Sequence, residues 1–442
     1  MFKTLLTISR VPFVRDVTTM QMGRLVTIGC SFLASILYVR YLELGGYGDY
    51  AVVLAYTGTV GLLINLGQQA TTMTFFAEAY GRKDRVGQAR VFHYYLVTSI
   101  VAAALLVLLA IASPAITEWI YGKSSVGSLS RLVFLSSICE LPFIFISIVL
   151  QTVREIRLLT ILENAKTMTQ LVVAVTFLSV GLGVTGLLMS SLAAAALFSL
   201  ISLFLSLRIW RRYGLPSIGE AMHTGKTSHF WRYAKEGFWM AIDKSLGNLY
   251  PNIFLFVFSI QASPAVVGLL RLGMKLADLP SSFALASISR LTSSVIPTMV
   301  GKGGAPLRKT ILRLVKHTVA FHVTISVAAA LIVPPLLPLV YGTAFKPAIF
   351  PFLVILILNL SLAFHAIATP ILRISSQIHI AAYLNAIATA VGIGLFFGLE
   401  NVMRPLWTLY VALAVYHVII ALTFIPVVKT LKHKIHTAEF SH

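Results

Sequence analysis

Apolar stretches of about twenty residues follow one another along almost the whole chain, and they constrain the fold more than any other feature. A helix of about 20 apolar residues crosses the roughly 30 Å hydrocarbon core of a bilayer. Of the 442 residues, 57% are hydrophobic and only 11% are charged, which excludes most classes of soluble protein. The long, mostly apolar run from Val97 to Ile111 excludes an outer-membrane barrel, because barrel strands alternate apolar and polar residues. The sequence therefore predicts an all-α polytopic membrane protein.

Glycine, proline and charged residues divide the apolar stretches into about twelve predicted transmembrane helices, six in each half of the chain. The predicted helices lie at about 17–39, 49–70, 92–113, 131–151, 158–180, 184–207, 236–259, 265–287, 317–340, 348–370, 378–398 and 405–427. The predicted domains are an N-terminal six-helix half at 1–207, a cytoplasmic linker at 208–231, a C-terminal six-helix half at 232–428 and a basic cytoplasmic tail at 429–442.

The basic residues are distributed unequally between the two sides of this predicted bundle. Most of the 35 Lys and Arg residues fall in the termini and in loops on the same side as the termini. The loops on the opposite side receive only Arg40, Lys123, Arg131, Lys346 and Arg404. The positive-inside rule therefore predicts that both termini are cytoplasmic. This topology accounts for most of the formal net charge of +20, so we expect no nucleic-acid partner.

The two halves of the sequence resemble each other at an offset of about 220 residues. The nearly constant spacing of the matches predicts a duplicated architecture, with the halves related by a pseudo-two-fold axis along the membrane normal. The matched pairs are Arg24 with Lys244, Asp16 with Glu236, Gly48 with Gly268, Tyr121-Gly122 with Tyr341-Gly342, and Asn164-Ala165 with Asn385-Ala386.

Five cations have no loop to occupy and fall inside predicted helices: Arg24, Lys166, Lys244, Arg271 and Lys275. A Lys or Arg at the centre of a membrane helix costs about 2.5–3.5 kcal/mol, so these side chains are expected to face a watery cavity or an acidic partner. Arg24 and Lys244 lie near the starts of their helices, so snorkelling to the interface is the alternative explanation for both.

The acidic residues beside these cations indicate different uses. Arg271, Lys275 and Asp278 are spaced i, i+4 and i+7, which places them on one face of the predicted eighth helix. Asp243 is next to Lys244 on the seventh. The candidate substrate-binding residues are Arg24, Lys244, Arg271 and Lys275, and the candidate ion-coupling residues are Asp243 and Asp278.

Other polar features of the sequence favour structural roles. Glu163 and Lys166 are i, i+3 neighbours and are predicted to form a local pair. Gly45-Gly46-Tyr47-Gly48 is predicted to form a tight turn. The sequence contains no Walker motif, nucleophile elbow or Cys-x-x-Cys pair, and its histidines lack the spacing of metal ligands. We therefore expect neither an enzyme nor a cofactor or metal.

Several local motifs resemble one family of membrane transporters. Arg24 is followed by the segment from Tyr41 to Tyr50, then by Leu66-Gly67 and by the basic loop Gly81-Arg82-Lys83-Asp84. Together with the length and the duplicated halves, these motifs resemble the polysaccharide flippases of the multidrug/oligosaccharidyl-lipid/polysaccharide (MOP) exporter superfamily, in the O-antigen (Wzx-type) branch.

This resemblance implies a V-shaped helical bundle in the bacterial inner membrane. Such a protein moves an undecaprenyl-diphosphate-linked oligosaccharide from the cytoplasmic to the outer leaflet by alternating access. The resemblance also implies that Arg24, Lys244, Arg271 and Lys275 serve the diphosphate. The implied partners are this lipid-linked oligosaccharide, the membrane lipids, a polysaccharide polymerase and a chain-length regulator.

Physical reasoning leads to a similar hypothesis. A lipid-linked diphosphate sugar needs a polar cavity, cations for about two negative charges, and a lateral opening for its lipid tail. Arg24 and Lys244, one from each half, are expected to clamp the diphosphate, while the cations near Asp278 guide the headgroup.

Two other classes of protein are alternatives. A multidrug antiporter of the same superfamily is expected to carry acidic rather than cationic cavity residues. A membrane polysaccharide polymerase or glycosyltransferase is expected to have a larger platform outside the membrane than the basic connection from Arg208 to Trp231. A flippase for a lipid-linked peptidoglycan precursor is a related possibility, but that branch typically has more than twelve helices.

Overall fold

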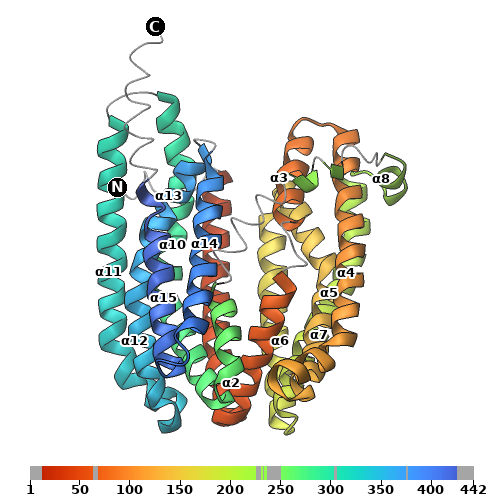
Figure 1. The fold of residues 1–442 in the computed structure, drawn as a ribbon. Helices are drawn as coiled ribbons and strands as arrows, with labels where there is room; N and C mark the ends of the chain where they lie inside the picture. The colour runs from red at the N-terminus through yellow and green to blue at the C-terminus, as the bar shows by residue number, and fades with distance from the viewer. Residues whose placement is uncertain are drawn as a thin grey trace. The chain divides into compact units, whose positions relative to one another are not determined.

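The computed structural model describes residues 12–62, 68–224, 230–231, 233–235, 250–302, 306–374 and 377–425 (Figure 1). These residues are almost entirely helical and include no β-strand. The chain divides into two compact units, Met1–Ala241 (unit 1) and Ile242–His442 (unit 2).

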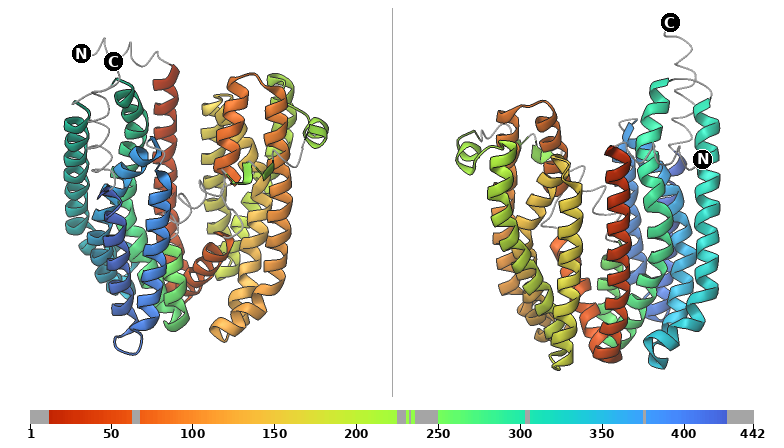
Figure 2. Two further views of the ribbon diagram at one scale, coloured as in Figure 1. Left: turned by 45° about the horizontal axis from the view of Figure 1, so that its top comes forward. Right: turned by 180° about the vertical axis from the view of Figure 1, so that it is seen from behind.

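Within the described residues, unit 1 contains six longer helices and one short one. They are α2 (Pro12–Leu62), α3 (Gln68–Gly81), α4 (Arg85–Tyr121), α5 (Ser124–Thr152), α6 (Ile156–Ser179), α7 (Gly183–Tyr213) and α8 (Ile218–Thr224). Long neighbouring helices such as α4 and α5 pack side by side, as two further views show (Figure 2). The helix α7 extends six residues beyond the predicted end at 207, into the segment that sequence analysis assigned to the linker.

The helix α2 contains a sharp break, and its position corrects one prediction. Glu43 has φ 56° and ψ −171°, which is not helical, and the helix continues on both sides of it. Gly45 to Gly48, predicted to form a tight turn, are helical instead. The predicted turn at residues 45–48 is therefore wrong. The chain breaks instead at Glu43, a residue that carries a Cβ atom and rarely adopts a positive φ.

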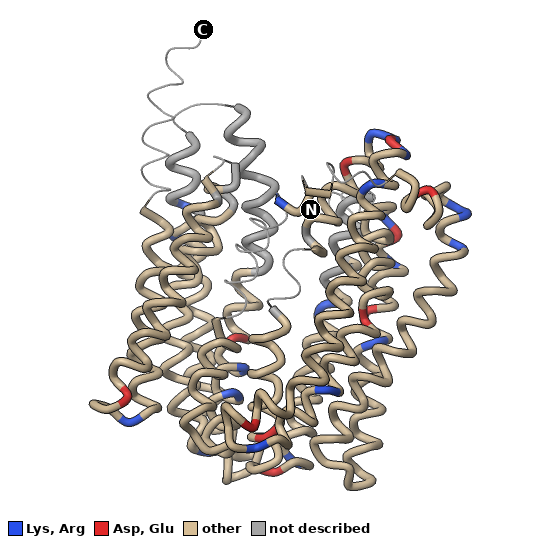
Figure 3. The backbone as a smooth tube through the Cα atoms, turned by 45° about the vertical axis from the view of Figure 1, so that its right-hand side comes forward, with Lys and Arg blue, Asp and Glu red and all other residues tan. Residues whose placement is uncertain are grey.

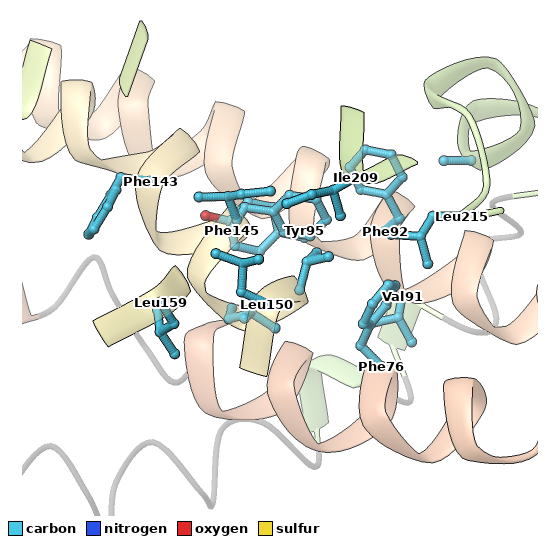
Figure 4. Packing of buried hydrophobic residues seen from close by; sticks show 14 of the residues in the cluster. Phe76, Val91, Phe92, Tyr95, Phe143, Phe145, Leu150, Leu159, Ile209 and Leu215 are labelled. Carbon is cyan, nitrogen blue, oxygen red and sulfur yellow. The ribbon is translucent and has the colours of Figure 1, made fainter. Parts of the chain in front are cut away.

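Aromatic and aliphatic residues pack together in a buried cluster of unit 1 (Figure 4). The ring of Phe145 on α5 stacks on Phe92 and Tyr95 of α4, with centroids 4.8 and 4.5 Å apart. The hydroxyl of Tyr95 donates a hydrogen bond to the carbonyl of Leu141 over 2.7 Å. The aromatic packing thus fixes α4 against α5, and the buried tyrosine is hydrogen-bonded.

Unit 2 contains a second group of helices. They are the helix Tyr250–Gln261, α10 (Pro264–Lys302), α11 (Pro306–Tyr341), the 3₁₀ helix η1 (Thr343–Ala348), α12 (Ile349–Leu358), the 3₁₀ helix η2 (Asn359–Ser361), α13 (Leu362–Ile374), α14 (Ile378–Gly398) and α15 (Pro405–Ala421). The helix α10 packs against α11, α12 and α13, and α14 packs against α15.

One pair of residues matched between the halves occupies equivalent places in the two units. Tyr121 ends α4 and Tyr341 ends α11, and each is followed by a glycine of positive φ. Gly122 has φ 64° and its N–H bonds the carbonyl of Glu118, which caps α4. Glycine adopts this left-handed conformation without the penalty of a Cβ atom. The Tyr-Gly repeat therefore marks a helix end in both units.

Seven helices within the described ranges are long and apolar enough to cross a membrane. These segments are Met22–Gly61, Arg85–Tyr121, Ser124–Thr152, Gly183–Tyr213, Val315–Tyr341, Thr343–Thr369 and His379–Gly398. Charged residues are sparse along the helices and gather mainly near their ends (Figure 3). The few charges within the helices are therefore candidates for function.

Candidate functional site

The charged stripe of α10 lies on the accessible side of that helix. Arg271 and Asp278 are half-buried, and Lys275 is exposed. Leu272 and Ala277, which lie on another face of α10, are fully buried in unit 2. The three charged residues thus share a face, as their spacing predicts. Because a charge facing lipid is costly, this face of α10 is suited to contact with water or a polar ligand.

Asp278 is held by a hydrogen-bonded network inside unit 2. The Nδ2 of Asn359 donates to Oδ1 of Asp278 over 3.1 Å and to the carbonyl of Ala277 over 3.2 Å. The hydroxyl of Tyr250 donates to Oδ1 of Asn359 over 3.1 Å. The amide of Asn359 is fully buried, and these bonds use both of its ends. Asn359 therefore fixes the position of the Asp278 carboxylate.

The backbone around Asn359 is irregular. The 3₁₀ helix η2 (Asn359–Ser361) separates α12 from α13 within one apolar segment. A short 3₁₀ piece inside a longer helical path changes the direction of side chains on either side. The sequence pattern alone did not predict a contact between Asn359 and Asp278. The available signal was an asparagine inside an apolar span, where an amide needs a polar partner.

Aromatic and histidine side chains enclose this network. Tyr250 stacks on Tyr416 with ring centroids 4.6 Å apart, and His417 meets Tyr250 edge-on at 5.3 Å. The Nδ1 of His417 and the hydroxyl of Ser361 lie 2.8 Å apart. Tyr416 donates a hydrogen bond to Oδ1 of Asn385 over 3.2 Å. A buried polar cluster therefore extends from Asp278 on α10 to α14 and α15.

Arg24 lies in unit 1 beside a close contact between α2 and α6. The hydroxyl of Thr27 donates to Oδ1 of Asn164 over 2.8 Å. Gly23 is so near Thr160 that a Cβ atom at position 23 would lie 2.1 Å from its Cγ2. Arg24 itself is half-buried, and in the described part of the chain no carboxylate lies within ion-pair distance of it. Arg24 thus lies on α2 between two residues, Gly23 and Thr27, that contact α6.

Lys166 has a different partner from the one predicted. Its ammonium forms a salt bridge with Glu140 on α5, not with Glu163 on its own helix α6. The same nitrogen lies 4.8 Å from the centre of the Phe143 ring. The prediction of a Glu163 pair is therefore wrong, because packing brings α5 within reach of Lys166. The prediction that Lys166 serves structure rather than substrate stays a prediction.

Two of the candidate site residues cannot be placed. Lys244 and Asp243 lie outside the described residues, so the predicted match of Lys244 with Arg24 and the predicted clamp stay predictions. Among the residues that the structure does describe, no group of three or more His, Cys, Asp or Glu side chains is arranged to hold a metal ion.

At one end of unit 1, a charged contact fastens α8 to α4. The Nε and Nη2 atoms of Arg85 donate to the two carboxylate oxygens of Glu220 over 3.0 and 2.9 Å, and Nη1 donates to the carbonyl of Gly214 over 3.2 Å. The hydrogen bonds from Arg85 lower the pKa of the Glu220 carboxyl below its ordinary value. This two-pronged geometry holds the segment after α7 in place.

Sequence comparison identifies one family along most of the chain. The sequence profile of the family described as polysaccharide biosynthesis protein matches residues 13–301. No curated protein sequence matches the chain significantly.

Solved structures show the same fold over nearly the whole chain. A multidrug resistance MATE family transporter of the MOP superfamily, in its outward-facing conformation, matches with a TM-score of 0.66 at 15% identity, covering 95% of this chain and 96% of that one. A eukaryotic MATE transporter matches with a TM-score of 0.64 at 16% identity, covering 97% of this chain and 99% of that one.

A third match is a MOP superfamily transporter from Pyrococcus furiosus, described as having a binding pocket of reverse polarity that suggests a different function. Its TM-score is 0.66 at 13% identity, with 96% of each chain covered. The predicted fold class, an all-α polytopic membrane protein with about twelve helices in two six-helix halves, is confirmed by these matches.

Proposed function

Because the chain belongs to the polysaccharide biosynthesis protein family, we propose that it is a flippase for an undecaprenyl-diphosphate-linked oligosaccharide. It moves this substrate from the cytoplasmic to the outer leaflet of the plasma membrane by alternating access and thereby serves the synthesis of cell-surface polysaccharide. The family match carries this proposal. The structural neighbours share the fold, but at 13–16% identity they do not define the substrate.

The diphosphate of the substrate is bound by cationic side chains from the membrane-spanning helices. Arg24, Lys244, Arg271 and Lys275 are the residues assigned to this role. Arginine offers two parallel donors to phosphate oxygens, and lysine offers a point charge. The accessible position of Lys275 and the half-buried position of Arg271 on one face of α10 support this assignment.

The polarity of these residues favours an anionic substrate over the cationic drugs of a multidrug antiporter. Arg271 and Lys275 together outnumber Asp278 on the accessible face of α10. The transporter from Pyrococcus furiosus supports the idea that pocket polarity, and with it function, differs among proteins of this fold.

The membrane potential is a sufficient energy source for the outward step. Moving two negative charges outward across an inside-negative membrane gains about 4.6 kcal/mol per 100 mV. Ion antiport is the alternative source, with Asp278 or Asp243 as the coupling carboxylate. The hydrogen bond from Asn359 to Asp278 supports Asp278 in this role. A carboxylate inside the membrane is costly, so those that occur are usually paired with polar groups and mark ion pathways.

The cellular setting follows from the same proposal. The protein lies in the bacterial inner membrane with both termini in the cytoplasm, as the positive-inside rule predicts. The basic ends of its helices then contact the cytoplasmic leaflet, where the lipid-linked substrate is loaded. A polysaccharide polymerase and a chain-length regulator are the partners that take the product on the outer side.

The test is the accumulation of substrate on the cytoplasmic leaflet. A strain that lacks the protein is expected to accumulate lipid-diphosphate-linked oligosaccharide there, and the wild-type gene is expected to relieve the accumulation. Arg24→Ala, Lys244→Ala and Arg271→Ala are expected not to relieve it at equal protein levels. Lys346→Ala, which removes an exposed cation in η1, is the matched control and is expected to behave as wild type.

Two results would contradict the proposal. If Arg24→Glu or Lys244→Glu retained full transport at normal protein levels, the assignment of these cations to the diphosphate would be wrong. If the deletion changed drug tolerance without any accumulation of lipid-linked sugar, the multidrug antiporter would replace the flippase. Transport at a clamped potential of zero separates the energy sources, because only ion antiport then still drives it.

A further inference from the structure

The helix α11 has a buried face made of polar residues. Thr318, His322 and Ser326 are 1%, 0% and 5% exposed, and their spacing of four residues places them in one row. Large apolar residues of the same segment, such as Phe321 and Val327, are exposed. This is the arrangement expected where the outer face of a helix meets lipid and the inner face meets something polar.

Two hydroxyls of this row have no hydrogen-bond partner among the residues that the structure describes. Within that part of the chain, the buried Oγ1 of Thr318 and Oγ of Ser326 make no hydrogen bond, and Nδ1 of His322 is also without a partner. Thr324, on the exposed side of the same helix, donates to the carbonyl of Ala320 over 2.8 Å, as threonine in helices often does. Hydrogen bonds among the described residues therefore leave part of the polar row of α11 unsatisfied.

The row faces α10 and leads toward Asp278. The Nε2 of His322 and the hydroxyl of Ser281 lie 3.1 Å apart. Ser281 is one turn from Asp278 on α10. Because α10 and α11 follow one another and pack together, they run antiparallel, so Ser326 lies level with Asp278 and Thr318 lies toward the opposite end.

The end of α11 next to Thr318 is basic. Arg313, Lys316 and His317 are exposed there, one turn or less from Thr318. The positive-inside rule places this end of α11 at the cytoplasm. The buried polar row thus connects the predicted cytoplasmic end of unit 2 with the level of the Asp278 carboxylate.

Buried polar groups without partners are satisfied by water where space allows. Each such group left dry costs about 1–3 kcal/mol, and buried waters typically bridge groups of this kind. We propose that Thr318, His322 and Ser326 of α11, with Ser281 of α10, line a water-filled path inside unit 2 that carries protons between the cytoplasm and Asp278. This inference rests on the ion-coupling role proposed above for Asp278.

The groups along the path suit proton transfer. A neutral imidazole accepts a proton at one ring nitrogen and releases the proton of the other. A proton taken up by His322 at Nδ1 from water is matched by one released at Nε2 to Ser281, whose own proton passes on toward Asp278 through water. The neutral ring then holds its proton at Nδ1, and exchange of that proton to Nε2 through water, or rotation of the ring, restores the starting tautomer for the next proton.

The titratable and charged groups around His322 leave this route open. On α10, Asp278, Lys275 and Arg271 lie on the accessible face, one turn or more from Ser281. On α13, the ring nitrogens of His365 face Thr369 and Thr423. On α11, the nearest charged groups are at the basic end described above.

Water access can be measured with single cysteines, independently of transport. In a variant with Cys30→Ser and Cys139→Ser, single substitutions Thr318→Cys and Ser326→Cys are exposed to Ag⁺ ions in inside-out membrane vesicles. Free thiols that remain are then counted after denaturation. Both cysteines are expected to react at least about tenfold faster than a cysteine in a dry core, because Ag⁺ enters only where water does.

Two matched controls distinguish a water-filled path from a dry core and from a surface covered by lipid. Ala363→Cys places a thiol in the apolar cluster of Ala284 and Leu285, and it is expected to react slowly. Thr324→Cys places a thiol on the outer, exposed face of α11 and is expected to be equally slow if lipid covers it. Equal, slow reaction of Thr318→Cys, Ser326→Cys and Ala363→Cys would overturn the path.

A second measurement tests the delivery of protons. His322→Leu is expected to abolish the response of transport to a pH gradient in proteoliposomes at zero potential, and His365→Leu, which lies off the path, is expected to keep it. Full gradient-driven transport in His322→Leu would overturn the inference. If the cysteines react fast but wild-type transport ignores the pH gradient, the ion-coupling role of Asp278 fails while the flippase proposal stands.

Discussion

Asn359 donates a hydrogen bond from Nδ2 to Oδ1 of Asp278 over 3.1 Å, and this bond joins η2 to α10. The other end of the same amide accepts a hydrogen bond from Tyr250. A single buried amide therefore connects three segments of unit 2. The carboxylate that is the candidate for ion coupling is held in one orientation by a residue whose own position depends on a 3₁₀ turn.

Replacing Asn359 with leucine is expected to destabilise the protein and to impair transport. The substitution removes both ends of the amide, so Asp278 loses a donor and the Tyr250 hydroxyl loses an acceptor. Each buried group left without a partner costs about 1–3 kcal/mol. The midpoint of thermal unfolding in detergent measures the loss of stability.

The matched control for this substitution is Asn401→Leu, because Asn401 is exposed in the turn between α14 and α15. It is expected to leave the unfolding midpoint near that of the wild type. An Asn359→Leu protein as stable as the Asn401→Leu protein would show that the network does not hold unit 2 together.

The fold was predictable because membrane-spanning helices are recognised in a sequence by their long apolar runs. An apolar run such as Val97 to Ile111 has only one way to satisfy its backbone in lipid, which is a helix. The shared face of Arg271, Lys275 and Asp278 was predictable for a related reason, since spacing along one helix fixes direction.

Contacts between helices were not predictable from the sequence. Lys166 forms a salt bridge with Glu140 and not with Glu163, which is nearer along the sequence, because the partner depends on how α5 packs against α6. The matched asparagines also differ: Asn164 accepts from Thr27 on α2, whereas Asn385 accepts from Tyr416 on α15. Periodicity places a residue on a face, but only tertiary packing supplies its partner.

Glu140→Gln is expected to destabilise unit 1 more than Glu163→Gln. The first change leaves the Lys166 ammonium on α6 without its salt-bridge partner. Since Lys166 is only 16% exposed but Glu140 is 37% exposed, we expect a cost of about 1–3 kcal/mol, below that of a fully buried pair.

The double variant with Glu140→Lys and Lys166→Glu provides a further test of this pair. It is expected to recover part of the stability that either single change removes, as measured by thermal unfolding in detergent. Equal effects of Glu140→Gln and Glu163→Gln would support the local pair instead.

Gly23→Ala is expected to disturb the contact between α2 and α6 beside Arg24. The new Cβ atom would lie 2.1 Å from Cγ2 of Thr160 and 3.0 Å from Nδ2 of Asn164. Such overpacking costs about 1–3 kcal/mol, which thermal unfolding measures. Gly29→Ala is the control, because in the described part of the chain a Cβ there would meet no atom of a neighbouring helix within 4 Å.

Adding Thr160→Ser to Gly23→Ala tests whether contact with Thr160 causes the loss of stability. It removes the Cγ2 atom that the new Cβ would meet, so the double variant is expected to be more stable than Gly23→Ala alone. If Gly23→Ala and Gly29→Ala unfolded at the same temperature, this would contradict the close contact between α2 and α6 at Gly23.

The contact between Arg85 and Glu220 is expected to make stability depend on pH. The hydrogen bonds from Arg85 lower the pKa of Glu220 in the folded protein below its ordinary value of 4.5. A lowered folded-state pKa contributes stability above about pH 4.5, and this contribution is lost as pH falls through the folded-state value. Glu220→Gln is therefore expected to unfold at a lower temperature than the wild type near neutral pH.

The difference between wild type and Glu220→Gln is expected to shrink as the pH is lowered, and to vanish once Glu220 is protonated in the folded protein. High salt is expected to reduce it at neutral pH, because both side chains are exposed to solvent. Glu118→Gln serves as the control, since Glu118 is exposed and makes no ion pair with the residues that the structure describes. A difference that persisted at low pH would show that Glu220 supports α8 through packing and not through its charge.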